Sequence, residues 1–134
     1  MTGPLAYLDS SAMVKLVFAE PESAALRAFM AESHGGVSSI LAKIEVARVA
    51  KRMHPSREAR NTAEGILRNI AFLPLADAVV LEAGELEPAI LRTLDAIHLA
   101  TAVSVREGLS GMVTYDRRLA DAARRAGLTV WSPR

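Results

Sequence analysis

The sequence contains no cysteine, and this absence excludes several kinds of chemistry at once. A chain without thiols has no disulfide bonds, no thiolate zinc site and no cysteine nucleophile. Any metal must therefore be bound by oxygen atoms or by imidazole nitrogens. The absence of disulfides also suits a reducing compartment, so we expect a cytoplasmic protein.

Long hydrophobic runs are missing as well. Charged residues such as Asp9, Lys15 and Glu45 interrupt the apolar segments, and residues 1–7 lack the basic cluster and apolar stretch of a secretory signal. We expect no association with a membrane. The glycine-rich motifs of nucleotide-binding proteins, G-x-x-x-x-G-K-[ST] and G-x-G-x-x-G, are also absent, which argues against a nucleotide-binding module. A phosphatase of the haloacid dehalogenase type would need a second acid two residues after Asp9, where Ser11 stands.

What the chain does have is apolar mass and an uneven distribution of charge. Its 134 residues are 51% hydrophobic, which is enough for one core, and we expect a single domain, 1–134. The net charge is only +1, but residues 43–68 carry seven basic and three acidic side chains, and residues 117–134 carry five and one. Residues 76–98 carry five acidic and one basic. Two basic segments are compatible with binding a polyanion, although solvated helix faces have the same composition.

Short apolar runs alternate with segments of helical periodicity along the whole chain. The pattern predicts strands at 4–8, 37–39, 71–75, 111–115 and 129–131. It predicts helices around 14–18 and 26–30, over 40–53, after Ser56, from Asp77, over 94–105 and over 117–126. Gly108 and Gly127 are predicted to end the last two helices in a left-handed conformation. This alternation predicts an α/β fold with a central, mainly parallel sheet and helices on both faces.

Four acidic residues lie where such a fold would bring chemistry together. Asp9 and Asp116 each follow a predicted strand and begin a helix, and parallel sheets bind ligands outside the carboxyl ends of their strands. Asp95 lies in the first turn of a strongly apolar helix. Glu45 lies at the edge of an apolar helical stripe, between Leu41 and Val49, where a carboxylate needs a partner.

A cluster of these carboxylates would be unstable without a cation. Close negative charges raise one another's pKa unless a divalent ion neutralises them, and oxygen ligands favour Mg²⁺ or Mn²⁺. Such an ion acidifies a bound water and stabilises charge on a phosphoryl group, so the quartet indicates phosphodiester hydrolysis.

Each of these residues also has a purely structural interpretation. Asp9 and Asp116 can be N-caps, Asp95 can complement a helix dipole, and Glu45 can pair with Arg48. His98, one turn after Asp95, is most simply a hydrogen-bonded core histidine. Ser10 and Thr114 flank the acids and can bind substrate phosphate or make caps and turns. Asp121 is expected to pair with a neighbouring arginine on the helix surface.

Four strings resemble PIN-domain proteins and, more narrowly, the VapC toxins of bacterial toxin–antitoxin pairs. They occur in order over nearly the whole chain: Leu8 to Ala12, Ser39 to Val49, Thr93 to Ala102, and Val113 to Leu119 followed by Gly127 and Leu128. The segment bearing Glu45 departs from the family in one respect, since Ile40 stands where many members carry a further acid.

The resemblance implies a Mg²⁺- or Mn²⁺-dependent endoribonuclease of PIN-like fold, which forms a homodimer and is inhibited by a cognate VapB-type antitoxin. Its catalytic acids map onto Asp9, Glu45, Asp95 and Asp116, with Asp9, Asp95 and Asp116 as metal ligands. We expect hydrolysis to leave 5′-phosphate and 3′-hydroxyl ends. Candidate contacts to RNA are Ser10, Thr114, Arg48, Lys51 and Arg117, with Arg52 and Arg118 beside them. The alternative is a non-catalytic module of the same fold that binds RNA or the antitoxin.

Overall fold

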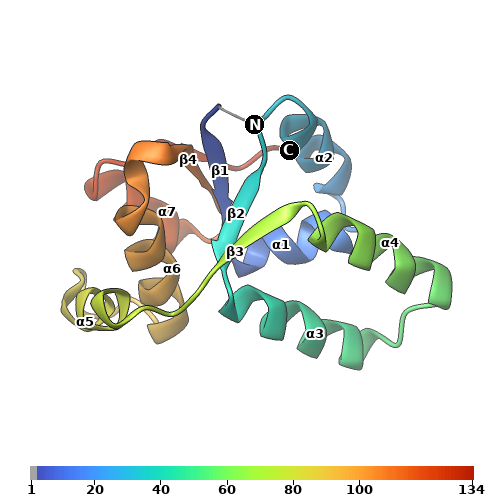
Figure 1. Cartoon of the computed structure of the whole chain (residues 1–134), viewed down its shortest axis with the longest axis horizontal. Coiled ribbons are helices and arrows are strands. Elements are labelled where there is room, and N and C mark those ends of the chain that lie inside the picture. Colours follow the sequence, from blue (N-terminus) through green and yellow to red (C-terminus); the bar gives the residue numbers. More distant parts are fainter. Residues whose placement is uncertain (1–2) are drawn as a thin grey trace.

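A parallel sheet of five strands runs through the computed structural model, which describes residues 3–134 (Figure 1). The strands are β1 (Leu5–Leu8), β2 (Gly36–Ser39), β3 (Ile70–Leu73), β4 (Leu109–Val113) and β5 (Val130–Trp131). Their order across the sheet is β3-β2-β1-β4-β5, and every neighbouring pair is parallel. The expected mainly parallel sheet is therefore confirmed.

Two layers of helices cover the two faces of this sheet (Figure 1). One layer consists of α1 (Ser10–Val17), α2 (Ser23–Ala31), α3 (Leu41–Met53) and α4 (Arg57–Leu67). The other consists of α5 (Asp77–Glu85), α6 (Thr93–Ser104) and α7 (Arg117–Arg125), with the short 3-10 helix η1 (Arg106–Gly108). The sequence predicted each of these α-helices, although the bounds differ by a few residues.

Side-chain alternation along β1 divides the interior into two cores. Ala6 and Leu8 pack against the layer of α1 to α4, whereas Tyr7 points into the layer of α6 and α7. Successive residues of a strand face opposite sides of a sheet, so one central strand contributes to both cores. Leu26 is buried in the first core, and the partly buried side chains of Phe29, Met30, Ile66 and Leu67 pack against it.

The path of the chain creates a crevice beside β1. The chain moves outward from β1 through β2 to β3, and then crosses to the other side of β1 to form β4 and β5. In open α/β sheets, ligands bind at the carboxyl ends of the strands where the order reverses in this way. The carboxyl ends of β1 and β4 lead directly to Asp9 and towards Asp116.

Local capping explains several of the helix ends. Asp9, Ser56 and Asp116 each accept a backbone N–H from the first turn of α1, α4 and α7. Gly127 ends α7 with a φ of 90°, as predicted. The same prediction for Gly108 is wrong, because α6 ends at Val105 and Gly108 lies in η1 with negative φ. No helix within residues 3–134 is both long and apolar enough to span a bilayer.

Candidate active site

Asp9 is a buried carboxylate whose position is fixed from three directions. Asp9 is the N-cap of α1, directly after β1, and is only 2% exposed. Oδ1 accepts hydrogen bonds from the Ser11 hydroxyl at 2.7 Å and from the Ala12 amide at 2.9 Å, and Oδ2 accepts one from the Thr114 hydroxyl at 2.6 Å. Burial raises the pKa of Asp9, and these three donors partly counteract that effect. The carboxylate is thus held rigidly at the end of the central strand.

Asp95 lies close enough to both Asp116 and Asp9 to interact with them electrostatically. Asp95 is half-buried in the first turn of α6, and its pKa is raised by burial and then by the negative charges of Asp116 and Asp9. Asp116 caps α7 by accepting the Leu119 amide on Oδ1 at 3.0 Å. Three of the four predicted acids therefore converge on the carboxyl edge of β1 and β4.

Glu45 reaches this region from the opposite helical layer. Its Oε1 atom lies 3.1 Å from Nε2 of His98, and 22% of its side chain is exposed. Partial burial acts to raise the pKa of Glu45, but hydrogen bonds from His98 and Ser10 outweigh it, so its pKa is lowered. The partner that the sequence required is His98 on α6 and not Arg48 on the same helix.

The carboxylates provide the chemistry that a hard divalent cation requires. All donors are oxygens, and the pKa of Asp95 is raised first by burial and then by the negative charges of Asp116 and Asp9, which a cation would neutralise. Within residues 3–134, however, no three acidic or histidine side chains are placed so that they could hold a metal ion together. Mg²⁺ retains several waters and is usually bound through one or two carboxylates, so an open arrangement of this kind fits it.

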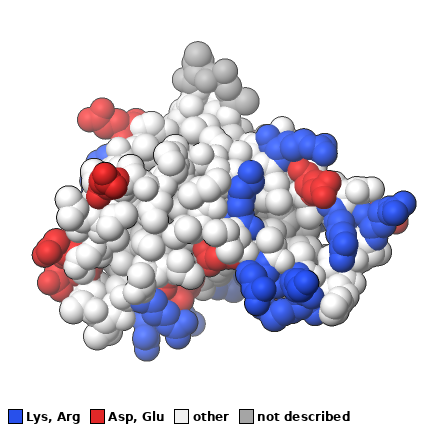
Figure 2. Space-filling view, turned by 60° about the horizontal axis from the view of Figure 1, so that its bottom comes forward, with Lys and Arg blue, Asp and Glu red and all other residues white. Residues whose placement is uncertain are grey.

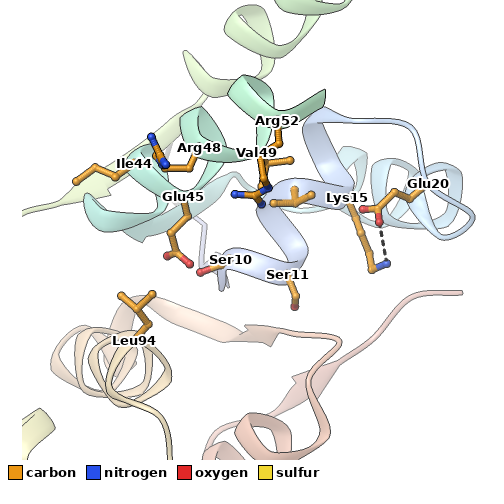
Figure 3. A pocket seen from close by; sticks show the side chains of 11 residues that line it. Ser10, Ser11, Lys15, Glu20, Ile44, Glu45, Arg48, Val49, Arg52 and Leu94 are labelled. Carbon is orange, nitrogen blue, oxygen red and sulfur yellow. Dashed lines mark ion pairs between the residues drawn. The ribbon is translucent and has the colours of Figure 1, made fainter. Parts of the chain in front are cut away.

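A groove of about 580 Å³ adjoins Glu45 (Figure 3). In Figure 3 the side chains of Glu45 and Ser10 point toward one another, and Leu94 of α6 faces them from across the groove. Arg48 and Arg52 of α3 line the same groove. A polyanion lying in it would therefore meet two guanidinium groups and the edge of the acidic cluster.

On the face drawn in Figure 2, the positive charge gathers mainly over one half of the surface. Figure 2 shows lysine and arginine over the part formed by α3 and α4, and acidic side chains over the opposite part, where α5 lies. Arg48 and Arg52 belong to this basic half and lie next to the candidate site. The basic half is thus the natural side for a nucleic acid to approach.

Other predicted substrate contacts lie elsewhere. Thr114 is fully buried and donates to Asp9, so its hydroxyl orients the carboxylate and does not face a substrate. Lys51 lines a separate groove between α3 and α4. Arg117 lies outside the groove of Arg48 and lines another pocket, together with Asp116 of the candidate site and Asp121. Ser10 lines the groove, but its hydroxyl is 2.8 Å from His98 Nε2.

Three residues that the sequence did not assign to the site contribute to its geometry. The Tyr7 hydroxyl lies 2.7 Å from His98 Nδ1 and accepts the Ser39 amide at 3.1 Å. Ser11 bonds to Asp9 and accepts the Tyr115 amide at 3.0 Å. A tyrosine in a buried strand and a histidine on an apolar helix carry a signal, since buried polar groups need partners. The identity of those partners depends on topology.

Comparison with known proteins gives a consistent result over nearly the whole chain. The model of the PIN domain family matches residues 6–125. The chain is 45% identical over 127 residues to Ribonuclease VapC46 of Mycobacterium tuberculosis, a match that covers 95% of this chain and 96% of that protein. It is 38% identical over 132 residues to Ribonuclease VapC47 of the same species, again with 95% and 96% covered.

Solved structures agree on the fold. A toxin–antitoxin complex from Klebsiella pneumoniae contains a chain that superposes with a TM-score of 0.70 at 22% identity, covering 96% of this chain and 98% of that one. VapBC2 from Rickettsia felis, bound to a DNA fragment from its promoter, matches with a TM-score of 0.72 at 13% identity, covering 97% and 99%.

Proposed function

The chain belongs to the PIN-domain family, and from this premise we propose that it is a divalent-metal-dependent endoribonuclease, the toxin of a toxin–antitoxin pair. The observation that carries the proposal is the convergence of Asp9, Asp95 and Asp116 on one edge of the sheet, where burial and then the charges of Asp116 and Asp9 raise the pKa of Asp95. The relatives named as ribonucleases align over 95% of the chain, which supports this activity for the whole fold.

The roles of the acids follow from their surroundings. Asp9, Asp95 and Asp116 would hold Mg²⁺ or Mn²⁺, which supplies an acidified water and stabilises negative charge on the phosphate. Glu45, whose lowered pKa keeps it ionised, orients the attacking water from the wall of the groove. Water adds to phosphorus while the bond to the 3′ oxygen breaks, so the products carry 5′-phosphate and 3′-hydroxyl ends.

The remaining residues serve binding and orientation. Arg48 and Arg52 hold the RNA backbone in the groove, and Ser11 and Thr114 keep Asp9 in place. Lys51 lies outside this groove and would contact only more distant phosphates, whereas Arg117 would contact a phosphate on the side of Asp116, with which it lines a pocket.

We further propose the partners and setting typical of the family. A VapB-type antitoxin inhibits the enzyme, and solved toxin–antitoxin complexes of the same fold support this. The chain acts as a single domain and as a homodimer in the cytoplasm, where it meets its RNA. An exposed apolar surface suitable for a second copy lies on α5 and the loop that follows, where Leu81 is 73% and Ile90 74% exposed.

Cleavage of RNA by purified protein tests the activity and the site together. Wild-type protein with Mn²⁺ should cleave RNA, EDTA should stop it, and Asp9→Asn and Asp95→Asn should each abolish it. Asp121→Asn is the matched control, because Asp121 is an exposed acid paired with Arg124 on α7 and should leave cleavage unchanged. Unchanged cleavage by either site variant would refute the assignment. Binding of RNA without cleavage in Mg²⁺ and Mn²⁺ would instead favour the non-catalytic module.

A further inference from the structure

His98 is a fully buried imidazole in the middle of an otherwise apolar helix. Its ring touches polar groups from three other elements: Tyr7 of β1 at Nδ1, and Ser10 of α1 and Glu45 of α3 at Nε2. A buried polar group at such a place is costly unless each of its atoms is satisfied. Both ring nitrogens of His98 have partners, so the imidazole is part of an ordered network.

The first half of this network has a defined direction. The Ser39 amide can only donate, so the Tyr7 oxygen accepts its hydrogen at 3.1 Å. The Tyr7 hydroxyl hydrogen is then available to His98 Nδ1, which lies 2.7 Å away. A neutral His98 ring that accepts this hydrogen on Nδ1 carries its own proton on Nε2.

The second half leads to the same tautomer independently. Glu45 Oε1 lies 3.1 Å from Nε2, and an ionised carboxylate can only accept. A bare Nε2 would place its lone pair against this carboxylate, which is unfavourable. The Ser10 hydroxyl, 2.8 Å from Nε2, is close enough to share the donated hydrogen while donating its own to Glu45. The two ends of this hydrogen-bond network therefore favour the same direction of donation. The Ser39 amide donates to the Tyr7 oxygen, the Tyr7 hydroxyl donates to His98 Nδ1, and His98 Nε2–H donates to Glu45.

The hydrogen bond between His98 and Glu45 joins the two helical layers. Glu45 lies on α3 in one helical layer, and His98 lies on α6 in the other (Figure 1). Among the hydrogen bonds and ion pairs of residues 3–134, the His98–Glu45 contact is the one that joins α3 to α6. Glu45 is otherwise a partly exposed side chain at the wall of a groove.

We propose that His98 is a positioning residue, whose tautomer is fixed by Tyr7 and Ser39 so that its Nε2–H holds the Glu45 carboxylate in place at the candidate active site. This inference rests on the proposed function, because it assigns His98 its effect through Glu45. It also explains why a histidine, and not an apolar residue, lies on the buried face of α6.

Nitrogen-15 spectroscopy of the imidazole rings tests the hydrogen-bond direction without any use of activity. In metal-free wild-type protein, His98 should show a bare Nδ1 and a protonated Nε2. His34 and His54 are exposed and serve as references in the same spectrum. Tyr7→Phe should weaken the preference for this tautomer, because only the contact with Glu45 then favours it. Tyr115→Phe should leave it unchanged, since the Tyr115 hydroxyl bonds to the Pro133 carbonyl. A proton on Nδ1 of wild-type His98, alone or in a doubly protonated ring, would overturn the relay.

Kinetics with RNA and Mn²⁺ test the consequence for Glu45. His98→Leu should lower kcat by roughly 10- to 100-fold with little change in KM, which is the usual cost of losing a supporting residue. His98→Gln retains an amide donor near the Nε2 position and should recover part of the loss. The double variant His98→Leu with Glu45→Gln should be no slower than Glu45→Gln alone, because both substitutions disrupt the same interaction, the hydrogen bond between His98 and Glu45.

The outcomes separate this proposal from the proposed function. Wild-type protein that fails to cleave RNA would contradict the ribonuclease assignment, whatever the tautomer of His98. Cleavage by wild type combined with additive losses in the double variant, or with no rescue by His98→Gln, would overturn the role of His98 alone. If His98→Leu does not fold, Tyr7→Phe replaces it in the same comparison, with Tyr115→Phe as its control.

Discussion

Asp9 and Asp116 each perform a structural task with one carboxylate oxygen. In both residues Oδ1 caps a helix by accepting a backbone amide, while Oδ2 of Asp9 accepts the Thr114 hydroxyl. The capping interpretation is therefore confirmed for both, and it does not compete with a role in metal binding. A cap fixes the carboxylate at a helix N-terminus, where the helix dipole also favours negative charge.

Because capping and charge are separate properties of Asp116, two substitutions should separate them. Asp116→Asn retains a good N-cap, so its stability should stay close to that of wild type while RNA cleavage is lost. Asp116→Ala should lose cleavage and, in addition, about 1 kcal/mol of stability. Thermal unfolding and cleavage assays on both variants test this. Equal stability of the two variants would show that the cap at α7 contributes nothing.

The ionised side chain of Asp95 should destabilise the metal-free protein, because burial and the charges of Asp116 and Asp9 raise its pKa. Asp95→Asn should therefore raise the melting temperature at neutral pH in EDTA. Since the side chain is only half-buried, we expect a gain of about 1 kcal/mol at most, or about 3–5 °C. The same substitution should abolish cleavage, so stability and activity change in opposite directions.

The pH dependence of this gain follows from the direction of the shift. A carboxyl group with a raised pKa in the folded state destabilises the fold once it ionises there, so the gain should be complete above that raised pKa. It should disappear below about pH 4, where Asp95 is protonated in both the folded and unfolded states. Asp121→Asn, at an exposed acid, is the control and should not show this profile. A gain that persists at low pH would contradict the electrostatic explanation.

The sequence predicted the helices and strands well, because their signals are local. Apolar periodicity placed α1 to α7, and the caps Ser56 and Gly127 were identified from residue type and position. Gly108 was assigned wrongly because a 3-10 turn and a left-handed C-terminus both favour glycine after a helix. Glu45 and His98 meet although they are 53 positions apart, and the strands also pair over long separations, such as Leu8 with Val113. Local pattern cannot specify such contacts.

Helical geometry separates the basic residues of α3 into two sets. Arg48 and Arg52 line the groove beside Glu45, whereas Lys51 lines a different groove. At 3.6 residues per turn, Lys51 is rotated about 120° from Glu45, whereas Arg52 is only about 20° away. Helical geometry alone would have assigned Arg52, and not Lys51, to the side of the site.

The space around Gly111 in β4 and around Gly65 in α4 predicts how replacement of each glycine by alanine changes the stability of the protein. A Cβ atom at Gly111 would lie 2.5 Å from the Thr129 carbonyl oxygen, which belongs to the backbone and cannot move aside easily. Gly111→Ala should therefore destabilise the protein by about 1–3 kcal/mol. Gly65→Ala, in α4 with open space around it, should instead stabilise by about 0.5–1 kcal/mol. Urea denaturation measures both, and a stable Gly111→Ala would contradict the close approach of these strands.

At the scale of the whole molecule, charge and catalytic residues are arranged side by side. The net charge is only +1, yet Figure 2 shows the basic side chains concentrated over α3 and α4. The acidic cluster lies at the border of that basic half, where Glu45 and Arg48 line one groove. An RNA strand attracted by the basic half would thus pass directly beside the carboxylates, which on their own would repel it.

This arrangement predicts which charges determine the salt dependence of RNA binding. Single-stranded nucleic acid loses affinity with salt at a slope of about 0.7 for each phosphate neutralised. In an inactive Asp95→Asn background, Arg48→Gln and Arg52→Gln should each reduce that slope by about 0.7, and the double variant by about 1.4. Lys51→Gln should reduce it less, because Lys51 faces the groove toward α4.

Arg106→Gln is the matched control for these arginine variants. Arg106 lies in η1, just before the amino end of β4, whereas the candidate site lies at the carboxyl ends of the strands. Neutralising it removes the same charge from the opposite edge of the sheet, so the slope should stay at the value of the Asp95→Asn background. A slope that falls equally for Arg48, Arg52 and Arg106 would mean that RNA responds to total charge alone. The groove beside Glu45 would then not be the path of the strand.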